Sequence, residues 1–291
     1  MSTIPPSFAV AGAVIFSGFI AIRAYRKKSL NLSGAVAGFV VMVIHLAANV
    51  RYGAMLVAFF LTSSALTKRG AERKRELDAG YKEGGQRNWI QVLSNSVIAT
   101  ILVATIWSLR GWVDSCLDSN ESKLITALVG GIIGHYCCCS GDTWSSELGV
   151  LSDEQPRMIT TFKVVRKGTN GAVTKTGLIA AAKAGAVIGL TYYLSGLLVG
   201  VKCLFGEAAL KQLLIIPLSS LMGLCGSLID SLLGATVQYS GYCQLRKKVV
   251  GKPAPTVKKI SGLDILDNNG VNLASILLTT LLTSLIFLAL F

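Results

Sequence analysis

Long runs of apolar residues constrain this chain more than any other feature of its sequence. Several approach the roughly 20 residues with which an α-helix crosses the hydrocarbon core of a bilayer. Hydrophobic residues make up 52% of the 291, and the mean hydropathy is +0.59, both above the values of ordinary soluble domains. We distinguish eight runs, at residues 4–22, 32–50, 53–66, 89–109, 124–139, 177–201, 213–237 and 271–290.

These runs predict an all-α polytopic membrane protein with about eight transmembrane helices, folded as a single integral membrane domain over residues 1–291. The run 53–66 is short, and a re-entrant segment is its alternative interpretation. Two long polar loops, 140–176 and 238–270, separate the later runs. No strand alternation and no second, soluble domain is evident.

The basic residues gather in alternate loops. Most of the 28 lysines and arginines lie in residues 23–31, 67–87, 140–176 and 238–270, which eight spans place on one face of the membrane. Cytosolic loops carry an excess of Lys and Arg, so this face is predicted to be cytosolic, with both termini outside. A net charge of +13 would suggest nucleic acid in a soluble chain. In a membrane chain it indicates loop orientation and attraction to anionic lipid, and no nucleic-acid partner is expected.

The chain shows no recognisable targeting segment. Residues 1–7 lack the basic region of a cleaved secretory signal, and no Ser/Arg-rich, acid-poor extension of the plastid transit type is seen. The first apolar run is therefore expected to be retained as a span.

The chain has 7 cysteines, of which Cys137, Cys138 and Cys139 are consecutive. Neighbouring side chains on a helix point about 100° apart, so these thiols form a poor metal site. An odd number without paired spacing argues against a disulfide framework. Small buried thiols, or palmitoylation near the membrane interface, are the two interpretations of the run.

An acidic motif, Gly141-Asp142-Thr143-Trp144-Ser145-Ser146-Glu147, follows the fifth run. Acids at the edge of a membrane span are costly unless paired or solvated, so Asp142 and Glu147 are candidate metal ligands. Residues five apart do not share a face of one straight helix. Gly141 must therefore mark a bend or a helix start if both carboxylates are to bind one ion. The structural alternative is that Asp142 is the N-cap of a helix.

A glycine-rich basic segment follows in the same loop. Its glycines allow the backbone to approach a ligand closely and to form an anion-binding nest, and a helix N-terminus comes directly after it. It lacks the glycine before the lysine that a Walker A loop requires. The alternative is a flexible turn with basic residues at the interface. The candidate phosphate-binding residues are Arg166, Lys167, Gly168, Thr169, Asn170, Gly171 and Lys175.

Two further polar segments belong to the same predicted face. Asp230 lies inside the seventh run, where a carboxylate needs a cation, a proton, water or pairing with Lys183. The segment before the eighth run offers oxygen ligands suited to Mg²⁺, including Asp267 and Asn268. Its alternative role is to cap the eighth helix through Asn268 or Asn269. Carboxylates for a metal ion and a glycine-rich basic loop are together what Mg²⁺-dependent phosphate transfer requires.

These motifs carry a family resemblance. Residues 141–147, 168–171 and 230–236 together resemble the transmembrane protein nineteen family, integral membrane proteins long described as a domain of unknown function. Residues 87–92 and 267–272 also look like its pattern, and the resemblance covers nearly the whole chain. The chain departs from the pattern at Asn170 and Ala172, where Ser and Gly are expected.

The resemblance implies an activity. A plastid branch of the family is the phytyl-phosphate kinase, which makes a diphosphate from an isoprenoid monophosphate. By this resemblance the chain is a membrane-embedded, Mg²⁺-dependent phosphotransferase that uses a nucleoside triphosphate and acts on a prenyl monophosphate. Asp142, Glu147 and Asp230 would then be catalytic. The expected metal ligands are Asp142, Glu147, Asp230, Asp267 and Asn268.

Other members suggest a non-enzymatic alternative. By length and by the absence of a transit-like extension, the chain looks like members implicated in glucose response and growth at the plasma membrane. A plasma-membrane regulator is therefore the first alternative function, and a transporter that uses Asp230 and Lys183 is the second. The plasma membrane is the predicted location, with the endoplasmic reticulum as the other candidate.

Overall fold

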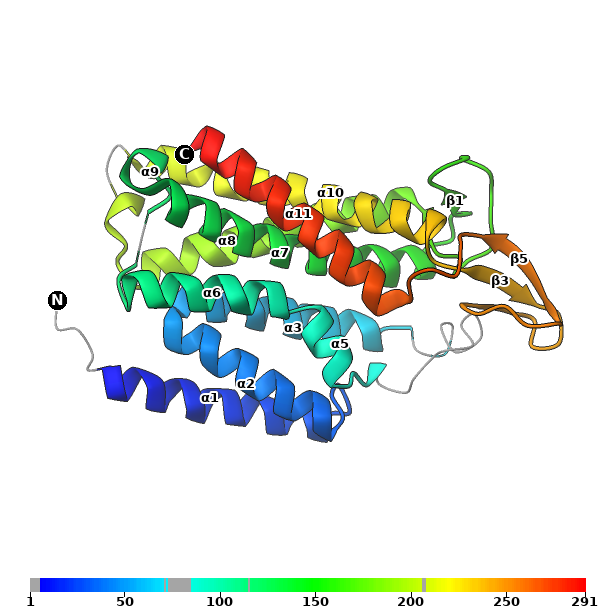
Figure 1. Ribbon diagram of the computed structural model, residues 1–291, viewed down its shortest axis with the longest axis horizontal. Coiled ribbons are helices and arrows are strands. Elements are labelled where there is room, and N and C mark those ends of the chain that lie inside the picture. The colour runs from blue at the N-terminus through cyan, green and yellow to red at the C-terminus, as the bar shows by residue number, and fades with distance from the viewer. Residues whose placement is uncertain (1–5, 71, 73–84, 115, 206–207) are drawn as a thin grey trace.

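A computed structural model describes residues 6–70, 72, 85–114, 116–205 and 208–291. Long helices run side by side along the longest axis of the molecule (Figure 1). They are α1 (Pro6–Arg26), α2 (Leu32–Ala48), α3 (Val50–Lys68), α6 (Val97–Arg110), α7 (Ser119–Leu151), α8 (Lys175–Leu198), α10 (Ile215–Thr236) and α11 (Asn268–Leu290). The short helices are α5 (Trp89–Ser94), η2 (Lys202–Leu204) and α9 (Ala208–Leu213). Residues 1–5 and most of the basic loop 67–87 lie outside the described residues.

Six of the described helices are long and apolar enough to cross a membrane: α1, α3, α7, α8, α10 and α11. The run expected at 53–66 belongs to α3, whose 19 residues suffice for a crossing, so a re-entrant segment is not required. The run expected at 89–109 is divided, because a capping box starts α5 at Asn88 and a second helix, α6, starts after Ser96. With 17 and 14 residues, α2 and α6 are shorter apolar helices, and eight crossings therefore stay a prediction.

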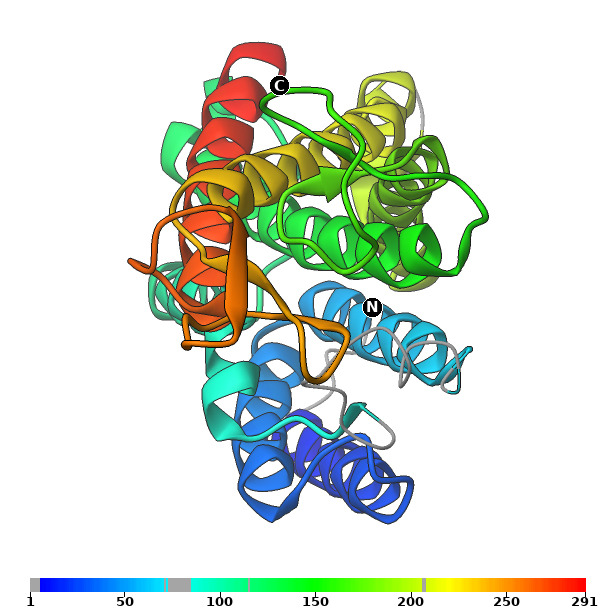
Figure 2. The ribbon, with the colours of Figure 1, turned by 90° about the vertical axis from the view of Figure 1, so that its right-hand side faces the viewer.

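The central helix is α7. In the most apolar 18-residue stretch of α7, 83% of the helix is buried inside the protein, compared with 22% in the corresponding stretch of α1. It packs against α8, α10 and α11 and also contacts α3, which lies with α1 and α2 on the other side of the bundle (Figure 2). Glycines allow α7 and α10 to approach closely: a Cβ on Gly226 would lie 2.8 Å from the Cα of Cys138, and one on Gly141 would collide with the carbonyl oxygen of Gly223.

The course of α7 corrects one expectation. The helix continues through residues 141–147 to Leu151, and its one non-helical residue is Ser122. Gly141 is thus neither a bend nor a helix start, and Asp142 is not an N-cap. Glycine occupies this position because the backbone of α10 leaves no room for a side chain.

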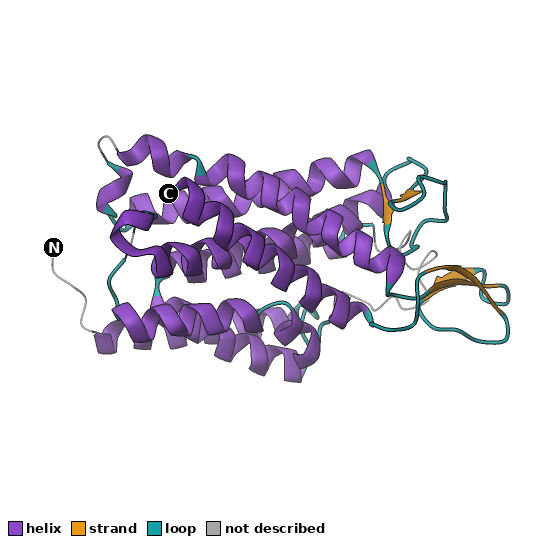
Figure 3. Ribbon diagram, turned by 45° about the horizontal axis from the view of Figure 1, so that its top comes forward, coloured by secondary structure: helices purple, strands orange, loops and turns teal. Residues whose placement is uncertain are grey.

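The two long polar loops contain short strands at one end of the bundle, where none was expected (Figure 3). They form a two-stranded antiparallel sheet, β1 (Arg157–Met158) with β2 (Ala172–Val173), and a three-stranded antiparallel sheet in the order β4-β3-β5. The latter comprises β3 (Ser240–Cys243), β4 (Lys248–Val250) and β5 (Val257–Ser261). The all-α class holds for the apolar part of the chain and is corrected for these loops.

A disulfide joins Cys116, in the loop before α7, to Cys203 of η2 at the opposite end of the bundle from the sheets. The argument against disulfides was therefore wrong for this pair, whose 87-residue separation gives no spacing signal. Cys137, Cys138 and Cys139 are buried free thiols. The structure supports the buried-thiol interpretation and leaves no accessible sulfur there for palmitoylation.

Candidate functional site

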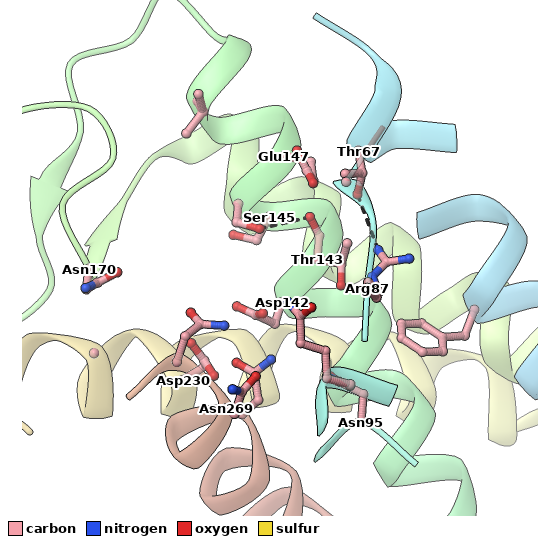
Figure 4. Close-up of a pocket in the computed structure, with 18 of the residues that line it drawn as sticks. Thr67, Arg87, Asn95, Asp142, Thr143, Ser145, Glu147, Asn170, Asp230 and Asn269 are labelled. Carbon is pink, nitrogen blue, oxygen red and sulfur yellow. Dashed lines mark hydrogen bonds between the residues drawn. The ribbon is translucent and has the colours of Figure 1, made fainter. Parts of the chain in front are cut away.

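The predicted motifs converge on one pocket of about 710 Å³ at the end of the bundle that carries the sheets (Figure 4). Its walls come from α1, α2, α3, residues 85–96, α7, the glycine loop 167–172, α10 and the start of α11. Pockets of this size are typical of small-molecule sites. The predicted residues in its lining are Asp142, Glu147, Asp230, Lys167, Gly168, Thr169, Asn170, Gly171 and Asn268.

Asp142 of α7 and Asp230 of α10 form the centre of the polar part. Their carboxyl groups lie within hydrogen-bonding contact of each other, and the Ser275 hydroxyl donates to Oδ2 of Asp230 over 2.9 Å. Two ionised carboxylates in contact repel unless a proton or a cation lies between them. Lys183, the alternative partner, is exposed on α8, and no ion pair joins it to Asp230 among the described residues.

Glu147 lines the same pocket farther along α7, on the side of Thr67 and Arg87 (Figure 4). Within the described chain, no three His, Cys, Asp or Glu side chains are placed to hold one metal ion. Because α7 stays helical, Glu147 cannot share a face with Asp142. The expectation that Glu147 joins both aspartates around one ion is therefore corrected.

The remaining donor set fits Mg²⁺. This ion keeps several waters and is usually bound through one or two carboxylates together with substrate phosphates. The pocket offers the two aspartates and, at the start of α11, the side-chain amides of Asn268, Asn269 and Asn272. A Mg²⁺ ion could thus be held here without a third acid.

Asp267 caps α11 outside the pocket lining. Its Oδ1 accepts the N–H of Gly270 at 2.8 Å, and its Oδ2 accepts the side-chain amide of Asn269 at 3.3 Å. The capping residue is thus Asp267, not Asn268 or Asn269 as expected. Each carboxylate oxygen accepts one hydrogen bond in the cap and Asp267 does not line the pocket, so its role as a metal ligand stays a prediction.

The glycine loop is fixed at the edge of the pocket. Gly168 and Gly171 have φ values of +83° and +76°, in the left-handed region that favours glycine, and a Cβ on Gly171 would collide with Ala235 of α10. The backbone N–H of Asn170 donates to Ser240 Oγ at 3.0 Å, and its side-chain amide donates to the carbonyl of Tyr239 at 3.2 Å. Asn170 therefore ties the loop to β3.

The basic residues around this loop separate into two groups. Lys167 lines the pocket, and its Nζ donates to the carbonyl of Ser152. Arg166 instead stacks on Tyr242, with Cζ 4.1 Å from the ring centroid. Lys175 is exposed in the first turn of α8. Neither Arg166 nor Lys175 lines the pocket, so their expected phosphate contacts are corrected.

Glu154 explains the position of Lys175. Its carboxylate accepts the N–H groups of Lys175 and Thr176 and the Thr176 hydroxyl. These hydrogen bonds hold the pKa of the Glu154 carboxyl below its ordinary value. The segment at Lys175 thus begins α8, and its N–H groups are occupied by a protein carboxylate.

Arg87 is a pocket residue that the sequence motifs did not assign to the site. Its Nη1 donates to Ser64 Oγ at 3.0 Å and its Nη2 to Thr67 Oγ1 at 3.4 Å. Burial lowers the pKa of the Arg87 guanidinium, and the nearby Glu147 carboxylate opposes this shift. Arginine keeps its proton in proteins, so Arg87 supplies a fixed positive charge.

The pocket also has an apolar wall. Helices α1, α2 and α3 contribute Ile20, Ala21, Val41, Met42, Leu56, Phe59 and Phe60. A single pocket thus combines acids, amides and cations at one side with an aliphatic and aromatic surface at the other. This combination suits an amphiphilic ligand with a charged head and an apolar tail.

Comparisons with known proteins agree with this architecture. Residues 15–280 match the family model described as "Integral membrane protein DUF92". The chain is 65% identical over 280 residues to Protein PGR of Arabidopsis thaliana, covering 96% of each chain. It is 30% identical to an uncharacterized membrane protein of Methanocaldococcus jannaschii, over 76% of this chain and 80% of the relative.

A plastid protein is also similar. The chain is 27% identical to "Protein VTE6, chloroplastic" of Arabidopsis thaliana, over 76% of this chain and 60% of the relative. No solved structure matches. The family indicated by the motifs is therefore confirmed, and the chain belongs to the integral membrane protein family DUF92.

Proposed function

We propose that the protein is a membrane-embedded, Mg²⁺-dependent phosphotransferase that transfers the terminal phosphoryl group of a nucleoside triphosphate to a prenyl monophosphate. The observation that carries the proposal is the contact between Asp142 and Asp230 in a pocket with an apolar wall. The family resemblance, which implies prenyl-phosphate kinase chemistry, supports the choice of acceptor.

The reaction asks mainly for alignment and charge neutralisation. A phosphate monoester has its second pKa near 6 and is largely dianionic at pH 7, so its oxygen can attack without a general base. A bond forms between this oxygen and the γ-phosphorus as the bond from that phosphorus to the β-γ bridging oxygen breaks. The products are a prenyl diphosphate and a nucleoside diphosphate, and no proton is gained or lost in the transfer.

Different residues would bind the metal ion, the donor phosphates and the prenyl tail. Asp142 and Asp230, with the amide oxygens at the start of α11, would hold Mg²⁺, which when bound neutralises phosphate charge. Lys167 and the backbone of residues 168–171 bind donor phosphates. The wall formed by α1, α2 and α3 holds the prenyl tail in a surface that is continuous with the bilayer-spanning part of the protein.

The test is product formation by purified protein in detergent, with Mg²⁺, ATP or CTP, and prenyl monophosphates of increasing length. We expect a prenyl diphosphate and one equivalent of nucleoside diphosphate, and no product when a chelator removes Mg²⁺. The free prenol is the matched control acceptor, and we expect it to react more slowly because its hydroxyl must lose a proton. Absence of diphosphate under every combination, from protein shown to be folded, would reject the proposal.

The non-enzymatic alternative is separated by one substitution. A plasma-membrane regulator of glucose response that acts through partner binding should tolerate Asp142→Asn, whereas a function that depends on phosphate transfer should be lost. A transporter built on an Asp230–Lys183 pair finds no support, because Lys183 is exposed and no ion pair joins it to Asp230 among the described residues.

We also propose that α2 and α6 cross the membrane, which gives eight crossings with the pocket on the cytosolic face and both termini outside. The Cys116–Cys203 disulfide lies at the other end, and disulfides persist in oxidising compartments. The plasma membrane and the endoplasmic reticulum both stay predictions, and the similarity to a chloroplastic protein adds a chloroplast membrane. A fluorescent fusion imaged with markers for the three membranes distinguishes them.

A further inference from the structure

The two cationic parts of the pocket lie on opposite sides of the aspartate pair. Figure 4 shows Asn170 of the glycine loop on one side of Asp142 and Arg87 on the other. Both Arg87 and Lys167 line the pocket. One pocket therefore offers two separate positions for an anionic group, with the carboxylates between them.

The Arg87 side adjoins the apolar wall. The backbone N–H of Arg87 donates to the carbonyl of Ser29, and its own carbonyl accepts the N–H of Asn31, both over 3.0 Å. These bonds hold the residue against the turn between α1 and α2. Beside it, Leu30 packs with Phe60 and Val92, and these three side chains also line the pocket.

The glycine-loop side has a different character. Its neighbours are Gly234 of α10 and Gln238 just after that helix, together with the backbone of residues 168–171. Backbone amides and a lysine suit the phosphates of a polar, water-borne ligand. The hydrogen bonds of Thr169 and Asn170 go to Arg166, Ser240 and Tyr239, none of which belongs to α1, α2 or α3.

The chemistry of Arg87 suits a terminal phosphate. A guanidinium has five N–H donors in a planar fork that matches phosphate geometry, and in the described chain its side chain donates to two hydroxyls. Donors therefore remain for a ligand in the pocket. Arg87 is partly buried, so less water competes for its guanidinium. A hydrogen bond from this group to a ligand phosphate is therefore stronger than it would be on the surface.

We propose that Arg87 binds the phosphate of the lipid acceptor, whose tail lies along α1, α2 and α3, while Lys167 and the glycine loop bind the donor nucleotide. The names of the two ligands rest on the proposed function. The assignment of an anionic lipid head to Arg87 is a statement about binding and needs no turnover. Arg87 thereby selects a phosphorylated acceptor over the free alcohol.

The experiment measures binding and turnover separately in three variants: Arg87→Gln, the charge-conserving Arg87→Lys, and Lys167→Gln as the matched change on the other side. Binding of farnesyl monophosphate alone, and of ATP with Mg²⁺ alone, is measured by ligand-induced thermal shift in detergent. Arg87→Gln should weaken farnesyl monophosphate binding about 10- to 100-fold, the usual value of a charge-assisted bond, and leave nucleotide binding unchanged. Lys167→Gln should do the reverse, and Arg87→Lys should retain part of the lipid affinity.

A second measurement uses the wild-type protein, in case Arg87→Gln does not fold. Arginines are modified with phenylglyoxal, and modification of Arg87 is followed by mass spectrometry. Farnesyl monophosphate should protect Arg87, whereas farnesol and ATP with Mg²⁺ should not. Protection by the nucleotide alone, or equal protection by farnesol, would overturn the assignment.

The outcomes for binding and function can be told apart. Selective loss of lipid binding in Arg87→Gln with no diphosphate from the wild type would refute the proposed reaction and support the lipid-phosphate site. Diphosphate formation together with a nucleotide-specific defect in Arg87→Gln would support the reaction and refute the site. Unchanged affinity for both ligands with a lower Tm would show that Arg87 only anchors its segment.

Discussion

At the scale of single residues, the contact between two carboxylates is the least ordinary feature of the molecule. Like charges in contact destabilise a fold, and natural proteins keep such arrangements where activity requires them. Asp142→Asn should therefore stabilise the metal-free protein by about 1 kcal/mol, while the rise in Tm that Mg²⁺ produces becomes smaller.

The measurement is a thermal melt with and without Mg²⁺. Asp264→Asn is the matched control, since Asp264 is an exposed acid at the same end of the bundle, and it should change neither value. A lower metal-free Tm for Asp142→Asn, with an unchanged response to Mg²⁺, would contradict the proposed metal site.

A second residue-scale prediction concerns the other end of the bundle. Arg51, whose side chain is 1% exposed, pairs with Asp114 at 3.0 Å and lies with Cζ 3.6 Å above the ring of Tyr192. Arg51→Met removes the buried cation from this ion pair and should cost about 3 kcal/mol of unfolding free energy.

The control for this change is the pair of Arg110 with Glu121, which are 3.8 Å apart and more exposed. Arg110→Met should cost less than about 1 kcal/mol. Denaturant or thermal unfolding in one detergent compares the two variants. Equal losses of unfolding free energy would show that burial does not make the Arg51 pair more stabilising than the exposed pair.

At the scale of elements, the crossing of α7 and α10 sets the distance between Asp142 and Asp230. Gly141→Ala places a methyl group against the carbonyl of Gly223, so the helices must move apart. We expect lower stability despite the better helix propensity of alanine, and loss of phosphate transfer. Gly12→Ala on α1, where a Cβ meets nothing within 4 Å, should be neutral or slightly stabilising. Full activity of Gly141→Ala would mean that the close crossing does not position the carboxylates.

The same elements show what could be predicted from sequence. The apolar runs located the long helices, and the acidic motif, the glycine loop, Asp230 and Asn268 do meet in one pocket. The end of α7 was placed too early because a glycine within polar residues resembles a helix boundary, while here it serves helix packing. The strands were missed because two to five residues are too short for alternation, and their pairing partners are set by the fold.

Charge alone does not identify which basic residues line the pocket. Arg166, Lys167 and Lys175 look alike in the sequence, but only Lys167 lines the pocket. The direction of each side chain depends on its neighbours: Tyr242 stacks with Arg166, and α8 begins at Lys175. Arg87 was overlooked for the same reason, since it is one cation in a strongly basic segment and only the fold brings it to the pocket.

At the scale of the whole molecule, the two ends of the bundle differ in chemistry. The pocket, the strands and the described parts of the basic segments lie at one end, and the Cys116–Cys203 disulfide lies at the other. In denaturant, we expect a maleimide reagent to label five cysteines before reduction and all 7 afterwards. Cys116→Ser should release Cys203 and leave the other thiols unchanged.

Sidedness is tested in sealed vesicles of known orientation. A membrane-impermeant reductant should open the disulfide only from the face opposite the basic loops. Reduction from the basic face alone, or labelling of all cysteines without a reductant, would contradict the proposed topology. Loss of the disulfide should cost about 2–4 kcal/mol, read as a lower Tm of Cys116→Ser.

The most direct test of the central claim is a double-mutant cycle on phosphate transfer with Asp142→Asn, Asp230→Asn and the combined variant. If the two carboxylates act as one unit on a single ion, each single change should reduce the rate at least about 100-fold, and the combined variant should be no worse than either. Independent, multiplying losses, or full activity in either folded single variant, would contradict the claim that the Asp142–Asp230 pair is the centre of the site.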